Sequence, residues 1–251
     1  MKIIAVTQAR YGSTRLPAKV LKEVNGETLL ETHLKRILQS DMITGLIVAT
    51  TNENGSDKIV KIAEKLNLPS YRGSVNDVLD RFYQAVVNEK PDYIVRITSD
   101  CPLIDPQIID KVIHLGIDND CDYVSNTLDP TYPDGMDCEC FKFSILEKTW
   151  KEASLKSDRE HVTPYIWRNS SYKGGTLFKS LCLKNDNDQS SIRLTVDNIE
   201  DFEVIKHLIN ALGTNKSCRE YVDYLMKHKE IAQLNSSYKR NEGYAKSLLN
   251  D

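Results

Sequence analysis

The sequence predicts an α/β fold in which a mostly parallel sheet is covered by helices on both faces. Short apolar runs typical of buried strands alternate with stretches whose apolar residues recur at helical spacing, which is the first observation behind this prediction. The second is a globular composition, since the 251 residues are 40% hydrophobic and 27% charged. This length is sufficient for one large core, and we find no internal repeat or low-complexity segment. A single domain is therefore expected.

The first half of the chain shows the alternation in order. Residues 3–6 predict a buried strand, and a polar loop follows it. Residues 29–38 carry one apolar stripe at three- and four-residue spacing, which predicts a helix. Another helix is expected over 106–115, where Pro106 occupies the first turn and its missing N–H is tolerated. Between these helices we expect strands at 46–50 and 93–98 and helices at about 59–66 and 76–87.

The pattern changes beyond about residue 128. The segment 129–183 reads as an inserted lobe, because strand-like runs at 139–143 and 176–183 are mixed with helical stretches at 145–153 and 159–167. A strand at 192–196, a helix at about 200–212 and two more helical pieces complete one domain over residues 1–234. The polar tail, residues 235–251, is expected to fray.

Charge and cysteine content exclude several classes of function. The 33 Lys and Arg residues are balanced by 36 Asp and Glu, a net charge of −3, whereas a general nucleic-acid binder needs a basic surplus. No apolar run approaches the roughly 20 residues that span a bilayer, and the apolar opening is too short for a signal peptide. The six cysteines are scattered, so free thiols are expected. We expect a cytoplasmic protein that acts on small molecules, with no nucleic-acid or membrane partner.

The loop after the first strand has a composition that suits a polyphosphate. It combines three cations, two hydroxyls and a glycine, beside which backbone N–H groups can approach an anion. These residues are Arg10, Gly12, Ser13, Thr14, Arg15 and Lys19. The loop lacks both the Walker spacing and the G-x-G-x-x-G fingerprint of dinucleotide binding. The alternative is an ordinary solvated basic loop.

Two aspartates follow two of the expected strands. Asp100 comes just after the strand at 93–98, and Asp197 just after the strand at 192–196. The carboxyl ends of parallel strands face one crevice, and a divalent cation that binds a nucleotide uses one or two carboxylates together with phosphate oxygens. Asp100 and Asp197 therefore form a candidate magnesium pair. The alternative is that each aspartate only caps a following helix.

A Gly-Ser turn at 71–75 precedes the helix expected at 76–87. Backbone groups in such a turn can read the edge of a nucleotide base. Asn76 or Asp77 can instead serve only as the helix cap.

Residues 132–137 and 158–165 place ionisable groups inside the expected lobe. A single histidine such as His161 is more often structural than catalytic. Arg159 and Glu160 can equally form a local ion pair that contributes little. This region alone therefore leaves its role open.

Taken together, these blocks resemble the cytidylyltransferase family of spore-coat polysaccharide biosynthesis proteins, which is related to acylneuraminate and Kdo cytidylyltransferases. The resemblance runs from about residue 2 to residue 234. It is carried by Q-A-R-Y-G-S-T-R-L-P-A-K at 8–19, R-G-S-V-N-D-V-L-D-R-F at 72–82, R-I-T-S-D-C-P-L-I-D-P at 96–106, Y-P-D-G-M-D-C-E at 132–139, D-R-E-H-V-T-P-Y-I at 158–166 and L-T-V-D-N at 194–198. It implies a Rossmann-like nucleotide-diphospho-sugar transferase fold, CTP as substrate, Mg²⁺ as cofactor, and a homodimer with the lobe at its interface.

The resemblance also implies roles for individual residues. Asp100 and Asp197 match the metal-binding carboxylates of the family, and Arg10, Arg15 and Lys19 match the cations that act on the triphosphate. The nucleotide-binding set is Gln8, Ala9, Arg10, Gly12, Ser13, Arg15, Lys19, Arg72, Gly73, Ser74 and Asp77, in which residues 72–74 fall where the family holds the cytosine. Candidate contacts to the acceptor are Arg96, Asp137, Arg159 and His161.

The implied reaction transfers CMP from CTP to an acidic sugar, or to a sugar or polyol phosphate, and releases pyrophosphate during the synthesis of surface polysaccharide precursors. Relatives specific for sialic acid have a P-A-R-G-G-S-K loop where this chain has Q-A-R-Y-G-S-T-R, so the acceptor is left open. Two alternatives are a nucleotidyltransferase that uses another triphosphate on a sugar phosphate, and a nucleotide-binding scaffold without turnover.

Overall fold

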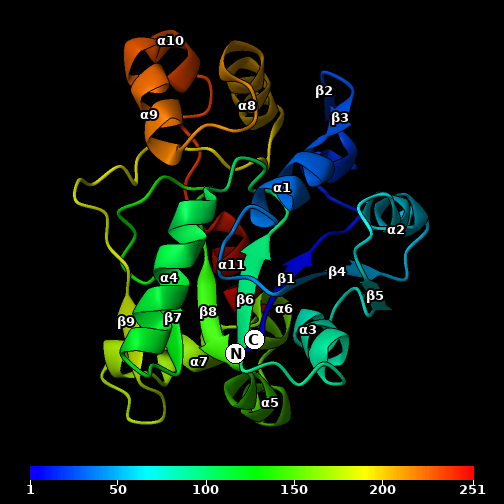
Figure 1. Cartoon of the computed structure of the whole chain (residues 1–251), viewed down its shortest axis with the longest axis vertical. Coiled ribbons are helices and arrows are strands. Elements are labelled where there is room, and N and C mark those ends of the chain that lie inside the picture. Colours follow the sequence, from blue (N-terminus) through cyan, green and yellow to red (C-terminus); the bar gives the residue numbers. More distant parts are fainter.

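The computed structural model describes the backbone of residues 1–251 and the side chains of all of them except Asn250. Within these residues, seven strands form one sheet in the order β5-β4-β1-β6-β8-β7-β9 (Figure 1). Within this sheet, as the structure describes it, only β8 runs antiparallel to its neighbours, which confirms a mostly parallel sheet. The strands are β1 (Ile3–Gln8), β4 (Gly45–Thr51), β5 (Ser70–Gly73), β6 (Tyr93–Thr98), β7 (Tyr123–Ser125), β8 (Glu139–Lys142) and β9 (Ser180–Cys182).

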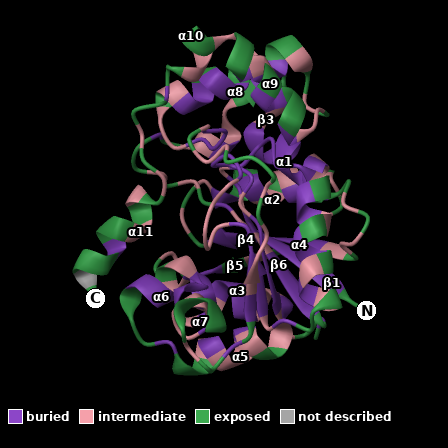
Figure 2. Ribbon diagram, turned by 90° about the vertical axis from the view of Figure 1, so that its left-hand side faces the viewer, coloured by how far each residue is buried: buried purple, intermediate pink, exposed green. Residues whose placement is uncertain are grey.

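Helices cover both faces of this sheet, as the alternation predicts (Figure 2). Neighbouring residues of a strand point to opposite faces, so Ala5 of β1 joins one core cluster and Ile4 joins another. On the Ala5 face lie α1 (Leu29–Ile37), α2 (Ser56–Lys65) and α4 (Pro106–Asp118). On the Ile4 face lie α3 (Val78–Val86), α5 (Phe143–Glu152) and α7 (Pro164–Arg168), and α6 (Lys156–His161) packs against α3.

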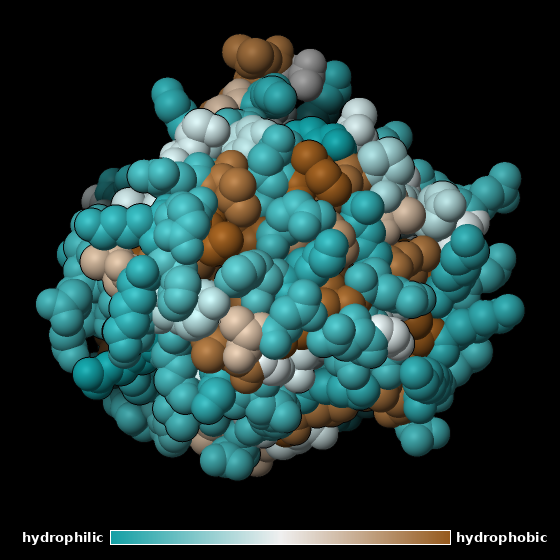
Figure 3. Space-filling view, turned by 90° about the horizontal axis from the view of Figure 1, so that it is seen from above, coloured by the Kyte–Doolittle hydropathy of each residue, from teal (hydrophilic) through white to brown (hydrophobic). Residues whose placement is uncertain are grey.

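A third cluster of apolar side chains lies beyond the carboxyl ends of the central strands, at the top of Figure 1. It is formed by α8 (Ile199–Leu212), α9 (Cys218–Lys227) and α10 (Lys229–Ala232), which pack against loop residues such as Leu103 and Leu194. Arg36 connects α1 to this third cluster. Its buried guanidinium donates to the carbonyl of Ile104 (2.6 Å), in the loop after β6, and to the carbonyl of Lys216 (2.9 Å), just before α9. The outer surface at this end is mainly hydrophilic (Figure 3).

The segment 129–183 is partly built into the main sheet. It supplies β8 and β9, and its helices share the core cluster that contains α3. The helical stretch expected at 159–167 is divided into α6 and α7, because Val162 has a φ of 71° and ends α6, and Pro164 then begins α7 at its first position. The 3₁₀ turn η2 (Ser171–Lys173) leads from α7 toward β9.

The strand expected at 192–196 is not a strand. The segment is extended, but it makes only an isolated bridge, between Asp134 and Arg193, among the described residues of the 192–196 stretch. Its backbone pairs with loops instead: Leu194 N–H donates to the Asp134 carbonyl (2.6 Å), and Val196 N–H donates to the Asp100 carbonyl (2.8 Å). The apolar side chains that suggested a strand are buried against α8 and α9.

The sequence pattern did not reveal β5, β7, the short 3₁₀ turn η1 (Lys19–Leu21) or the hairpin of β2 (Glu23–Val24) and β3 (Glu27–Thr28). The expectation of a frayed tail is also wrong. Residues 242–250 form α11 (Glu242–Ser247) and η3 (Leu248–Asn250), and the Asp251 carboxylate accepts from the Ser157 N–H (2.7 Å). No helix in the described part of the chain is long and apolar enough to cross a membrane.

Candidate active site

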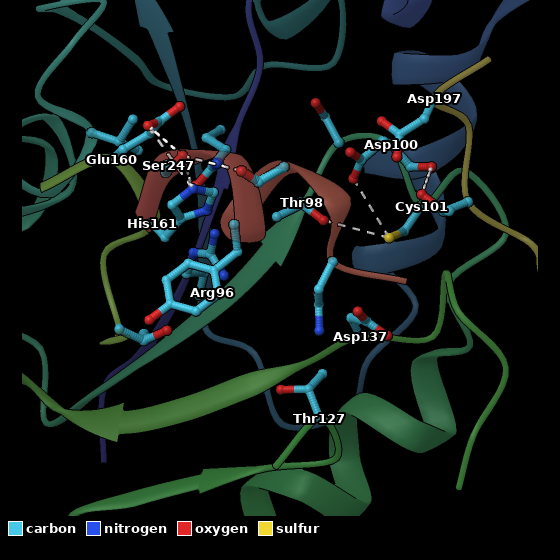
Figure 4. A pocket seen from close by; sticks show the side chains of 18 of the residues that line it. Arg96, Thr98, Asp100, Cys101, Thr127, Asp137, Glu160, His161, Asp197 and Ser247 are labelled. Atoms are coloured by element: carbon cyan, nitrogen blue, oxygen red, sulfur yellow. Dashed lines mark hydrogen bonds and ion pairs between the residues drawn. The ribbon is translucent and has the colours of Figure 1, made fainter. Parts of the chain in front are cut away.

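A cleft of about 890 Å³ opens at the carboxyl ends of β1 and β6. Its walls come from the loop after β1, the loop after β6, the extended segment at 193–197, the helices α6 and α7, and the C-terminal helix α11. Thus five stretches that are distant in the sequence meet in one cavity (Figure 4). Open α/β sheets bind their ligands at this edge.

The loop after β1 brings its cations to this cleft. Arg10, Arg15 and Lys19 all line it, as do Gln8, Ala9 and Ser13. Arg10 is exposed and makes no ion pair with any described side chain, so its guanidinium is available to an anion. Arg15 is paired with Asp197 at 2.9 Å. This part of the expected nucleotide site is therefore assembled in one place.

Gly12 does not line the cleft, and the structure gives it a packing role. The Glu53 carboxylate lies against it so closely that a Cβ at position 12 would be 2.5 Å from Glu53 Oε1. Nearby, the ring of Tyr11 packs on Gly55. These two contacts fix the loop to the end of β4, which holds its cations over the cleft.

Lys19 lies between the two candidate metal ligands. Its ammonium is 3.0 Å from Asp100 Oδ2 and 2.8 Å from Asp197 Oδ1. Burial acts to raise the pKa of Asp100, but Lys19 and a hydrogen bond from Thr98 outweigh it and hold that pKa below its usual range. Burial likewise acts to lower the pKa of Lys19, but the two carboxylates raise it overall. Lys19 and Asp100 are therefore both charged at neutral pH.

The helix-capping alternative fails for both aspartates. The N-cap of α4 is Asp105, and the N-cap of α8 is Asn198, whose capping box includes Asp201. Asp197 is instead held by the buried Arg193, which donates to Asp197 (3.1 Å) and to Asp201 (2.8 Å). Its carboxylate is thus left facing the cleft.

These carboxylates suit a hard divalent cation. The chain itself already places a cation, the Lys19 ammonium, in contact with both Asp100 and Asp197. The described residues contain no cluster of three or more His, Cys, Asp or Glu side chains with metal-binding geometry. Magnesium that is bound with a nucleotide typically uses one or two carboxylates together with phosphate oxygens and water, which is the set that this cleft can provide.

Four members of the expected nucleotide-binding set do not line the cleft, namely Asp77 and the three residues expected at the cytosine, Arg72, Gly73 and Ser74. Arg72 is paired with Asp57, and Gly73 lies in β5 with its carbonyl accepting from the Asn52 N–H (3.2 Å). Ser74 Oγ accepts from the N–H groups of the residues two and three positions later. Asp77 caps α3 by accepting from the Asp80 N–H (2.9 Å).

Arg81 reaches the cleft instead. It is buried, donates to the Ser74 carbonyl (2.8 Å), and leaves its Nε without a partner. The Gln8 Oε1 atom, which also belongs to a cleft-lining residue, is likewise buried and unpartnered in the part of the chain that the structure describes. Burial lowers the pKa of Arg81 to about 10, and the neighbouring Arg10 adds to this effect. These atoms offer one acceptor and one donor to a ligand.

Three of the four acceptor candidates, Arg96, Asp137 and His161, line the cleft. Arg96 and His161 lie close together in Figure 4, and Asp137 lies on the other side of the view, below the Asp100 group. Arg96 is paired with Glu139, which also accepts from Tyr123 (2.6 Å). Burial lowers the pKa of His161, and the charge of Arg96 lowers it further, so this imidazole is neutral at pH 7.

Arg159, the fourth candidate, does not line the cleft. Its guanidinium donates to the Asp77 carboxylate at 2.7 and 3.1 Å and to the Trp150 carbonyl at 2.8 Å. It joins α6 to the start of α3 and does not pair with Glu160 as the sequence suggested. The D-R-E-H block therefore sends only its last two side chains to the cleft.

Several lining residues escaped the sequence analysis. Arg193 could have been predicted from the sequence. It is a charged residue inside an apolar run, so it requires a buried partner of opposite charge, and Asp197 follows four positions later. The C-terminal residues had no such signal, since they lie in a polar stretch with no periodicity. The polar and charged residues missed include Arg81, Asp134, Lys173, Arg193, Asn241, Glu242, Tyr244, Lys246 and Ser247.

Comparisons with known proteins give consistent matches. A family model described as "Cytidylyltransferase" matches residues 4–241. The chain is 40% identical over 243 residues to an uncharacterized protein of Methanocaldococcus jannaschii, covering 96% of this chain and 97% of that protein. It is 31% identical over 239 residues to the spore coat polysaccharide biosynthesis protein SpsF of Bacillus subtilis, covering 92% and 96%. A solved cytidylyltransferase from Leptospira borgpetersenii superposes with a TM-score of 0.87 at 37% identity, covering 95% of this chain and all of that one (100%).

Proposed function

The chain belongs to the cytidylyltransferase family and is a nucleotidyltransferase, and we propose that it transfers CMP from CTP to an acidic acceptor with release of pyrophosphate. The observation that carries this proposal is the meeting of Asp100, Asp197 and Lys19 within hydrogen-bond distance, with Arg10 and Arg15 lining the same cleft. A cationic loop beside paired carboxylates suits a triphosphate with its metal ion.

In the proposed reaction, an oxygen of the acceptor forms a bond to the α-phosphorus of CTP while the bond from that phosphorus to the bridging oxygen breaks. Pyrophosphate leaves with the electron pair, and a hydroxyl acceptor loses its proton. Asp100 and Asp197 would hold Mg²⁺, which supplies positive charge to the phosphates when bound. Arg10, Arg15 and Lys19 neutralise the transferring and leaving groups. Catalysis then depends on positioning and electrostatics, with no covalent step on the protein.

The composition of the other half of the cleft supports an acidic acceptor. Lys173 is exposed at its rim, and among the described side chains it has no carboxylate partner, only the rings of Trp167 and Tyr172 below its ammonium (6.0 and 5.5 Å). Arg96 and His161 lie deeper in the same half. These donors suit the carboxylate of an acidic sugar or the phosphate of a sugar or polyol phosphate.

The similarity to SpsF, which is named for spore coat polysaccharide biosynthesis, supports a place in the cytoplasmic synthesis of surface polysaccharide precursors. We further propose that the active form is a homodimer with part of residues 129–183 at its interface. Light scattering of the purified protein tests this, because a monomeric mass would contradict it.

Two measurements test the proposed activity. Competition among CTP, UTP, GTP and ATP for binding should favour CTP, and preference for another triphosphate would indicate a different nucleotidyltransferase. Pyrophosphate release from CTP should occur with at least one member of a panel of acidic sugars and sugar phosphates. Tight CTP binding with no release for any of them would instead indicate a nucleotide-binding scaffold.

A further inference from the structure

The C-terminal helix α11 forms one wall of the cleft. In Figure 4 it is the red helix that lies between the His161 group and the Asp100–Asp197 pair. We call residues 240–247 the C-terminal clasp. Its members that line the cleft are Asn241, Glu242, Gly243, Tyr244, Lys246 and Ser247.

The clasp holds two of the acceptor candidates by direct polar contacts. Arg240 pairs with the carboxylate of Asp137 and also donates to the Tyr132 carbonyl (3.2 Å). Ser247 Oγ is 2.9 Å from His161 Nε2 and donates to Glu160 (2.8 Å). Each end of the clasp therefore fixes the orientation of one side chain that faces the acceptor half.

An aromatic contact joins the same parts. The ring of Tyr244 meets His161 edge-on at a centroid distance of 5.2 Å and Trp167 at 5.8 Å. Together these three rings form an apolar corner next to polar groups. Such a corner suits a sugar, which presents C–H groups on one side and hydroxyls at its edge.

The clasp is tied less firmly to the phosphate-binding half. One contact there is a pair between Glu242 and Arg15 at 3.4 Å, in which both side chains are about one-third exposed (33% and 36%). An exposed pair of this length contributes little. A second is a long pair between Arg240 and Asp134 (3.9 Å), whose carboxylate is held more closely by Arg193 (2.7 Å). Triphosphate binding to Arg15 therefore leaves the contacts at Asp137 and His161 in place.

We propose that the C-terminal clasp completes the acceptor subsite, where Arg240 and Ser247 position Asp137 and His161 for an acidic sugar. This inference rests on the proposed function. The helix α11 begins at residue 242, directly after residues 4–241 that the family model matches, so most of the clasp lies outside that match while Asp137 and His161 lie inside it. The clasp thereby adds to acceptor selectivity without changing how CTP is held.

Steady-state kinetics of Arg240→Ala and Ser247→Ala test the proposal. CTP is used with 3-deoxy-manno-octulosonate, N-acetylneuraminate and glycerol 3-phosphate as probe acceptors. We expect the acceptor KM to rise roughly tenfold, the effect of losing one hydrogen bond to a charged or polar group, while the KM for CTP stays within about twofold. Arg240→Lys should recover part of the loss, because it retains the charge.

Lys239→Ala is the matched control, because its side chain is exposed and lies just outside the clasp. It should change neither KM. Thermal unfolding and CTP titration calorimetry of every variant separate a local effect from misfolding. If the wild type turns over an acid but the clasp variants keep its acceptor KM, or raise both KM values equally, the clasp proposal is wrong and the proposed function stands. If the wild type turns over none of the probes, both are overturned.

Discussion

Replacing Lys19 with methionine should affect metal binding and turnover in opposite directions. In the structure the Lys19 ammonium contacts both Asp100 and Asp197, the carboxylates proposed to hold magnesium. In the absence of nucleotide, the ammonium and a divalent ion therefore compete for the same oxygen atoms. Lys19→Met removes the competitor, so the free enzyme should bind Mn²⁺, used as a probe for Mg²⁺, more tightly than the wild type.

The size of the effect follows from the exposure of the three side chains, which is 14% for Lys19, 26% for Asp100 and 20% for Asp197. Partly exposed pairs of this kind contribute up to about 1 kcal/mol each. Losing two of them corresponds to roughly 2 kcal/mol, or about a 30-fold lower Kd for Mn²⁺. Turnover should nevertheless fall by roughly 10²- to 10³-fold, because a cation that stabilises transferred phosphate charge is lost.

Isothermal titration with Mn²⁺ and a pyrophosphate-release assay measure the two effects on one protein preparation. Lys22→Met is the control, because the Lys22 ammonium lies over the Phe202 ring (5.0 Å) and not against these carboxylates. Unchanged or weaker Mn²⁺ binding by Lys19→Met would refute the competition between ammonium and metal. Unchanged turnover would refute the role of Lys19 at the triphosphate.

Three further predictions concern stability and the support of the cleft. Arg159→Ala removes the ion pair with Asp77 and should lower the free energy of unfolding, measured by denaturant titration, by about 1–3 kcal/mol. Both KM values should stay unchanged, and an altered KM would place Arg159 in the active site. His33 is fully buried, and burial is the main reason that its pKa is lowered to about 4. The free energy of unfolding should therefore fall by up to about 3 kcal/mol as the pH drops from 6.5 to 4. His33→Gln should flatten this pH dependence, and an equal slope in the variant would contradict the assignment. Gly135→Ala should cost roughly 2–4 kcal/mol, because a Cβ there lies 2.4 Å from the backbone of the 193–197 segment and φ is +105°. Gly174→Ala, which has an ordinary left-handed backbone and open space for a Cβ, should cost only about 1 kcal/mol, and equal losses would rule out the clash.

The sequence predicted a strand or helix correctly where the local apolar pattern matches the faces that the element buries in the fold. Strands β1, β4 and β6 are continuous apolar runs because both of their faces are covered, and the helices between them show regular apolar spacing. The cations of the 8–19 loop and Asp100 could be paired from the sequence, because β1 and β6 are parallel strands whose ends share one edge. Asp197 reaches the same edge for a reason other than the one expected: its segment is not a strand, and the Val196 N–H donates to the Asp100 carbonyl (2.8 Å).

The misplaced parts depend on contacts that a local pattern does not encode. The run at 192–196 is apolar because Leu194 and Val196 face α8 and α9, and burial against helices looks the same in sequence as burial in a sheet. The C-terminal clasp is a six-residue helix plus flanking turns, too short to have periodicity, and it is ordered by Tyr244 and Ser247 packing on α6 and α7. The D-R-E-H block shows that neighbouring residues of one motif can have different roles. Arg159 makes a structural ion pair with Asp77, whereas His161, two positions later, lines the cleft.

The magnesium dependence of pyrophosphate release from CTP tests the central claim most directly. Asp100→Asn and Asp197→Asn keep the side-chain shape but remove the charge that a hard cation requires. We predict that each raises the magnesium concentration for half-maximal release by roughly tenfold or more, while Asp118→Asn on the exposed end of α4 leaves it unchanged. Wild-type magnesium curves for both cleft variants would show that these two aspartates do not hold the metal of the reaction.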